Sequence, residues 1–92
     1  MIQDFSDNDT RELFENESNR RFSFIARVAL RKLIQMNRAT RLEDLAVPPG
    51  NRLEALKGNL SGFHSIRVND QWRIVFCWTS KGPAQVRIED YH

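Results

Sequence analysis

Apolar and polar residues alternate with a period of two through most of the second half of the chain. In the run that starts at Trp72, every second residue as far as Trp78 is large and apolar, which predicts a strand with one buried face. The polar residues Asn69–Gln71 separate this run from another apolar one, so the two runs form a predicted hairpin. The full set of predicted strands is Ile2–Phe5, Arg52–Leu56, Phe63–Val68, Trp72–Thr79 and Gln85–Tyr91.

The first half shows apolar residues at steps of three and four, which is typical of amphipathic helices. The longest such stripe consists of Phe22, Ile25, Ala26, Ala29, Leu33 and Met36. On the opposite face, four arginines fall within roughly 40° of each other, namely Arg20, Arg27, Arg31 and Arg38. This ridge is either an ordinary solvent-facing helix surface or a contact surface for an outside partner.

A shorter helix is predicted over Thr10–Phe14, with several N-cap candidates in Ser6–Asp9. Ala39–Leu45 is expected to add a last helical turn before Pro48–Gly50, which ends any helix. Predicted turns lie at 57–62 and 81–83. The chain of 92 residues is therefore expected to form one domain, 1–92, of the α+β class.

The basic residues are mostly arginine, with eleven Arg and three Lys, although the formal net charge is only +2. The planar guanidinium binds phosphate through two hydrogen bonds, so the bias favours an anionic partner, nucleic acid first. A GC-rich genome is the alternative explanation. The single cysteine, Cys77, excludes an intramolecular disulfide. Without an apolar run of membrane-spanning length or a signal peptide, we expect a soluble, cytoplasmic protein.

The predicted hairpin places basic residues on the face of the sheet opposite the core. If Val68 pairs with Trp72, then Arg67 lies directly across from Arg73, and such a like-charged pair destabilises a sheet unless an anion relieves it. On the last strand Arg87, Glu89 and Tyr91 share one parity and are expected to join this face.

Metal binding is not expected, because no His, Asp or Glu set has metal-ligand spacing. His64 has the parity of the core residue Ile66, so a partly buried structural role is expected for it. No cofactor motif of the GxGxxG or GxxxxGK[ST] type is present.

Three stretches of the chain together closely resemble the HigB toxins of the RelE/ParE superfamily of type II toxin–antitoxin systems. They are Arg52–Gly58, Gly62–Ile74 and the ending Glu89–His92. The resemblance covers nearly the whole chain and implies a small antiparallel sheet with two helices packed on one face. It further implies a ribosome-dependent endoribonuclease that cuts mRNA on the 70S ribosome. Its implied inhibitor is a HigA-type helix-turn-helix antitoxin, through which alone the toxin would reach operator DNA.

The resemblance also implies the residues of the site. Arg73 matches the family's catalytic arginine, and Asp90, Tyr91 and His92 match its C-terminal catalytic group. Glu54 stands where some members carry a histidine, and a carboxylate there either replaces a general base or repels phosphate. The expected RNA or ribosome contacts are Lys57, Arg67, Arg87, Arg52, Arg27 and Arg31. No metal and no cofactor are expected.

Two other functions fit the same fold. One is inhibition of DNA gyrase in the manner of ParE-like relatives, since a fold alone does not define an activity. The other is a ribosome-binding module whose catalytic site has decayed, which Glu54 motivates. The C-terminal group favours the nuclease, because a gyrase-binding surface needs no imidazole.

Overall fold

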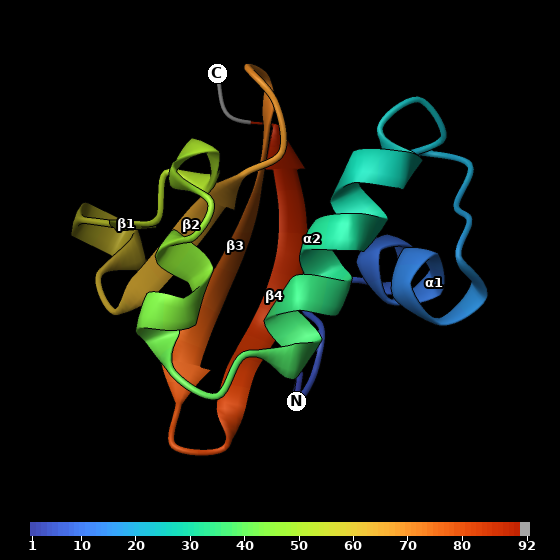
Figure 1. Ribbon diagram of the computed structural model, residues 1–92. Coiled ribbons are helices and arrows are strands. Elements are labelled where there is room, and N and C mark those ends of the chain that lie inside the picture. Colours follow the sequence, from blue (N-terminus) through green and yellow to red (C-terminus); the bar gives the residue numbers. More distant parts are fainter. Residues whose placement is uncertain (91–92) are drawn as a thin grey trace.

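The computed structural model describes residues 1–90 as two helices and a four-stranded antiparallel sheet (Figure 1). The sheet has the strand order β1-β2-β3-β4. The strands are β1 (Glu54–Ala55), β2 (Phe63–Arg67), β3 (Trp72–Thr79) and β4 (Gly82–Asp90). The helices are α1 (Asn8–Asn16) and α2 (Ala26–Arg38), followed by the 3-10 turns η1 (Leu42–Ala46), η2 (Pro49–Asn51) and η3 (Gly58–Leu60). The expected α+β class, with two N-terminal helices on one face of the sheet, is confirmed.

The core lies between α2 and the sheet, where most of the predicted apolar stripe is buried. Phe22 and Ile25 of that stripe precede the helix, which begins only at Ala26. Phe22, Ala29, Leu33 and Met36 are all fully buried. From the sheet, Ile74 and Phe76 of β3 meet this stripe, as their period-two pattern predicted. None of the described helices is long and apolar enough to cross a membrane.

The first helix is longer than predicted by two residues at each end. Asp7 is its N-cap and accepts a hydrogen bond from the Thr10 backbone N–H at 2.6 Å. Thr10 is itself fully buried, and its Oγ1 accepts a hydrogen bond from the Ile88 backbone N–H at 3.1 Å. This contact fixes the start of α1 on β4.

Three predicted elements are shorter than expected or absent. Ile2–Phe5 is not a full strand but an extended segment with one parallel bridge, between Phe5 and Val86 of β4. Residues 39–45 do not extend α2, because Ala39 is extended and a separate 3-10 turn follows. The strand predicted over Arg52–Leu56 is reduced to β1, which has two residues at the sheet edge.

The last strand begins three residues earlier than predicted and contains a β-bulge. Gly82 already pairs with Thr79, so the hairpin turn is shorter than the predicted 81–83. The register shifts between Val75 and Cys77, and Gln85 adopts a positive φ of 52° at this point. The N-terminal segment stabilises the bulge, because the Gln85 backbone N–H donates to Asp4 Oδ1 at 2.6 Å.

Candidate functional site

The sheet face away from the helices carries the residues predicted to act. In the observed register Arg67 pairs with Arg73, and Glu89 of β4 pairs with Arg73 on its other side. The next row across the sheet contains Glu54, Ser65, Val75 and Arg87. The predicted opposition of Arg67 and Arg73 is confirmed, as is the shared parity of Arg87 and Glu89.

Arg73 is held in place by several contacts and is only 7% exposed. Its Nε donates to Ser65 Oγ at 2.8 Å. One terminal nitrogen donates to the Arg52 carbonyl at 2.8 Å and to the Ser65 carbonyl at 3.3 Å. The same nitrogen lies 3.9 Å from Glu54 Oε1. Arg73 is therefore a fixed, charged group at the bottom of this face rather than a solvent-facing side chain.

The burial of Arg73 follows from the path of the chain before β1. Arg52 ends the η2 turn in the left-handed conformation, with φ 47°, and turns its carbonyl toward the guanidinium. Ser65, from the neighbouring strand, is fully buried beneath it. The alternation of β3 predicted the face of Arg73 correctly, but it cannot show that this part of the face is covered.

Carboxylates of the chain itself lie beside the arginines of this face and offset part of the repulsion between Arg67 and Arg73. Arg67 forms an ion pair with Asp70 of the β2–β3 turn. Arg87 forms one with Glu89 on the same strand, and its guanidinium lies 5.4 Å from the centre of the Phe63 ring. Each arginine of the face thus has local partners that fix its direction.

The rim of this face has more exposed charges. Glu54, on the edge strand β1, has a half-exposed side chain. Lys57 immediately precedes η3 and is exposed, as is the Arg52 side chain. Arg27 and Arg31 are also exposed, but they lie on α2, on the other side of the sheet. The structure therefore does not bring these two together with Arg73.

Asp90 is the last residue that the structure describes. It pairs with Trp72 in the sheet register, and its Oδ2 accepts a hydrogen bond from Gln71 Nε2 at 3.0 Å. The end of β4 therefore lies beside the start of β3, and the residue that Asp90 pairs with is the one before Arg73. The predicted catalytic residues Tyr91 and His92 lie outside the described residues.

Several buried polar side chains were not predicted from the sequence, and two of them concern the charged groups directly. Ser65 is one, and the signal for it was a small polar residue with the parity of Arg67, two residues before it on the same strand. Lys32 is the other: it is nearly buried on α2 and donates to the fully buried Asn51 side chain. Burial lowers the pKa of Lys32, and the neighbouring charge of Arg31 lowers it further. His64 is partly buried, as expected.

Among residues 1–90, no three His, Cys, Asp or Glu side chains gather in a way that would hold a metal ion. Among the described residues, the charged side chains of this face that can act on a ligand are the anchored Arg73, the cations around it and the carboxylate of Glu54. Such a set can bind an anion and exchange protons with it.

Comparison with known proteins identifies the family. A model of the RelE-like toxin of the type II toxin–antitoxin system HigB matches residues 3–92. The chain belongs to this HigB-like family. The toxin HigB-1 of Vibrio cholerae serotype O1 is 41% identical to this HigB-like chain over 80 residues, which cover 85% of this chain and 84% of the relative. An uncharacterized protein of Haemophilus influenzae is 37% identical over 54 residues, 59% of this chain and 54% of that protein.

The fold has a solved counterpart. The crystal structure of YafQ from E. coli strain BL21(DE3) matches this HigB-like toxin with a TM-score of 0.62, over 98% of this chain and 91% of that one. The sequence identity is 16%, so this likeness concerns the fold alone.

Proposed function

We propose that this HigB-like toxin is a ribosome-dependent endoribonuclease that cleaves mRNA without a metal ion and so stops translation and growth. The observation that carries the proposal is the anchoring of Arg73, a nearly buried guanidinium held by Ser65 and the Arg52 carbonyl. A fixed cation of this kind stabilises charge that develops in a transition state, since it needs no reorganisation during the reaction. Membership of the HigB-like toxin family supports the same activity.

In the proposed reaction the 2′-hydroxyl of one nucleotide loses its proton and attacks the adjacent phosphorus. The bond from phosphorus to the 5′-oxygen breaks, and that oxygen takes up a proton as it leaves. The products are a 2′,3′-cyclic phosphate and a 5′-hydroxyl end. Arg73 stabilises the doubly charged phosphorane, with Arg67 and Lys57 contributing to the same positive field.

Proton transfer is assigned to the groups around Arg73. Glu54, whose Oε1 is 3.9 Å from the guanidinium, takes the proton of the 2′-hydroxyl when a phosphate sits against Arg73. His92 donates the proton to the leaving 5′-oxygen. Asp90 and Tyr91 orient His92 and the RNA. The roles of Tyr91 and His92 rest on the family resemblance, because both lie outside the described residues.

The partners of the proposed enzyme are the 70S ribosome, mRNA and an antitoxin. The exposed rim residues Arg52 and Lys57, with Arg87 deeper on the face, bind phosphates of mRNA or ribosomal RNA. As a type II toxin the chain is proposed to be neutralised by a HigA-type helix-turn-helix antitoxin. Operator DNA is reached only through that antitoxin.

The test is to map new 5′-hydroxyl RNA ends in cells after a brief pulse of the toxin. The variants are His92→Ala and Glu54→Gln, with Glu43→Gln as a matched control, since Glu43 is an exposed carboxylate in η1. We expect in-frame ends with the parent and the control. Removal of a general acid or base is expected to reduce cleavage by about 10²- to 10⁴-fold.

Two outcomes would contradict the proposal. Growth arrest without new RNA ends, accompanied by trapped gyrase–DNA complexes, would establish the ParE-like activity instead. Ribosome association that survives His92→Ala, with no ends from any variant, would indicate a binding module. Full cleavage by Glu54→Gln would remove only the role of Glu54 as base.

A further inference from the structure

One aromatic ring is left in solvent although its neighbours are buried. Phe22 and Phe24 both lie in the connection between α1 and α2, and Phe22 is fully buried. The side chain of Phe24 is 72% exposed. Its ring nevertheless contacts Trp72, with centroids 6.3 Å apart at an edge-to-face angle of 67°. Trp72 thus packs against the Phe24 ring, while most of the ring surface remains accessible to solvent.

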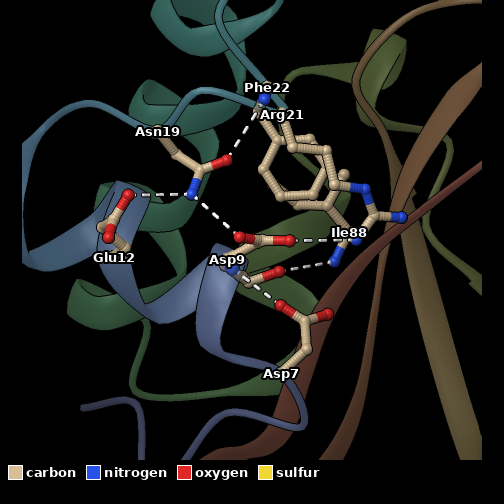
Figure 2. A network of polar contacts seen from close by, with 8 residues as sticks. Asp7, Asp9, Glu12, Asn19, Arg21, Phe22 and Ile88 are labelled. Atoms are coloured by element: carbon tan, nitrogen blue, oxygen red, sulfur yellow. Dashed lines mark hydrogen bonds and ion pairs between the residues drawn. The ribbon is translucent and has the colours of Figure 1, made fainter.

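The connection that presents Phe24 is tied down by a polar network around Asn19 (Figure 2). Asn19 is 7% exposed, and its Nδ2 donates to Asp9 Oδ1 at 3.1 Å and to Glu12 Oε1 at 3.0 Å. Its Oδ1 accepts the Phe22 backbone N–H at 3.2 Å. Arg21 adds an ion pair with Asp9. Because the segment is fixed before any ligand arrives, binding to Phe24 needs little additional ordering.

Phe24 lies near the end of the sheet where β3 begins and the described part of β4 ends. Trp72, which supports the ring, is the register partner of Asp90. The start of α2 and the end of β4 lie at the same end of the molecule, away from the N-terminus (Figure 1). A nucleotide bound beside Asp90 on this side of the molecule therefore lies close to the ring.

The sequence around Phe24 is rich in arginine. Arg20 and Arg27 flank Phe24 in sequence, and Arg31 follows Arg27 one helical turn further along α2. All three are exposed, and none forms an ion pair within residues 1–90. An exposed aromatic ring with cations on one side is the arrangement that binds single-stranded nucleic acid, through base stacking and phosphate contacts.

A protein partner is the weaker candidate for this surface. Such a contact is expected to have a wider apolar centre. Among the described residues the other large exposed hydrophobics are Met1, Ile34 and Val47. Ile34, the one on α2, is ten residues further along the chain and about two helical turns past the start of α2. Phe24 is therefore an isolated exposed ring in an arginine-rich part of the chain.

We propose that Phe24 stacks on a base of the mRNA that flanks the cleaved step, while Arg27 and Arg31 bind the phosphates that follow it. The inference rests on the proposed ribonuclease function and adds to it a second RNA contact, on the helical side of the molecule. It assigns Arg27 and Arg31 to mRNA bound near the sheet end, separate from the Arg73 face.

The experiment measures cleavage of mRNA on programmed ribosomes by purified toxin, under single-turnover conditions. Phe24→Ala is expected to lower kcat/KM by about 5- to 150-fold, the range for loss of one base–aromatic stack. Phe24→Trp keeps a π-face and is expected to retain activity, whereas Phe24→Leu keeps only apolar bulk and is expected to lose it. Val47→Ala, at a similarly exposed position, is the control and is expected to match the parent.

A second measurement tests the phosphates. Arg27→Gln combined with Arg31→Gln is expected to reduce the salt dependence of binding to programmed ribosomes, whereas exposed Lys81→Gln on the β3–β4 turn is not. Thermal unfolding of each variant checks that the fold is intact.

The outcomes distinguish failure of the stacking proposal from failure of the proposed nuclease function. If the parent cleaves and Phe24→Ala cleaves equally fast with the same distribution of ends, the stacking inference is wrong and the nuclease stands. If Phe24→Leu is as active as the parent while Phe24→Ala is not, the ring contacts a protein instead. A parent that produces no cleavage on programmed ribosomes overturns both proposals.

Discussion

Replacing Ser65 by Ala tests whether the anchoring of Arg73 is energetically important. The substitution removes the hydroxyl that accepts the Arg73 Nε–H at 2.8 Å and changes little else in volume. Ser65 is fully buried and Arg73 is 7% exposed, so water cannot readily replace the lost acceptor. A hydrogen bond to a charged group contributes about 1.5–3 kcal/mol, and we expect the free energy of unfolding to fall by that amount.

The assay is urea or thermal unfolding of the purified protein at pH 7, with Ser80→Ala as the control, because Ser80 is exposed in the β3–β4 turn. For a domain of this size, a loss of about 1.5 kcal/mol corresponds to a fall in Tm of at least roughly 6 °C. A double-mutant cycle with Arg73→Met isolates the contact, since the effect of Ser65→Ala is expected to shrink in that background.

A change of less than about 0.5 kcal/mol in Ser65→Ala, equal to that of the control, would refute the reasoning. It would mean that Arg73 finds another acceptor without loss and is not fixed by Ser65. If the contact is as strong as the geometry indicates, cleavage by Ser65→Ala should also decrease, because the guanidinium then loses its fixed direction at the phosphate.

Three further predictions concern the scaffold. Gly82→Ala should destabilise the fold by about 1–3 kcal/mol in unfolding experiments, because φ is 131° there and a Cβ would lie 2.3 Å from the Met1 carbonyl oxygen. Gly50→Ala, with open space around the added Cβ, should leave the stability unchanged. Asn19→Ala should cost about 1–3 kcal/mol, since it leaves the buried Phe22 N–H without its acceptor and removes the donor to Asp9 and Glu12. Exposed Asn59→Ala should not, and equal stabilities of the two variants would argue against the network. Lys32 has a lowered pKa in the folded state, so the unfolded chain binds more protons and stability should rise with pH between that lowered pKa and about 10.4. Lys32→Met should lack this rise, and identical pH profiles of the two proteins by urea unfolding would contradict it.

The elements with strong local patterns were predictable from the sequence. The bounds of β3, Trp72–Thr79, were predicted correctly because large apolar residues alternate over its whole length. The buried positions Ala29, Leu33 and Met36 of α2 were also predicted correctly, since they recur at helical spacing. Phe22 and Ile25 of the same predicted stripe are buried too, but they lie before the helix. In both cases burial of one face determines the structure, and the sequence records that face directly.

The elements that depend on distant partners were not predictable in detail. The N-terminal segment is held by single bonds to β4, such as that of Asp4 to the bulge residue Gln85. β1 is reduced to two residues because the chain before it turns toward Arg73. Neither arrangement produces a periodic pattern in the sequence, because both depend on contacts between residues that are far apart along the chain.

The same distinction applies to the candidate site and explains what is unusual about it. Parity placed Arg73 opposite Arg67, but only the tertiary structure shows that Arg73 is buried against Ser65 and the Arg52 carbonyl. A solvent-facing arginine would have to be ordered each time a phosphate binds, at a cost in side-chain entropy. An arginine already held by the fold avoids that cost and presents its charge in one direction. The stability that Ser65 provides and the catalysis proposed for Arg73 therefore depend on the same hydrogen bond, so substitutions that loosen it should reduce both.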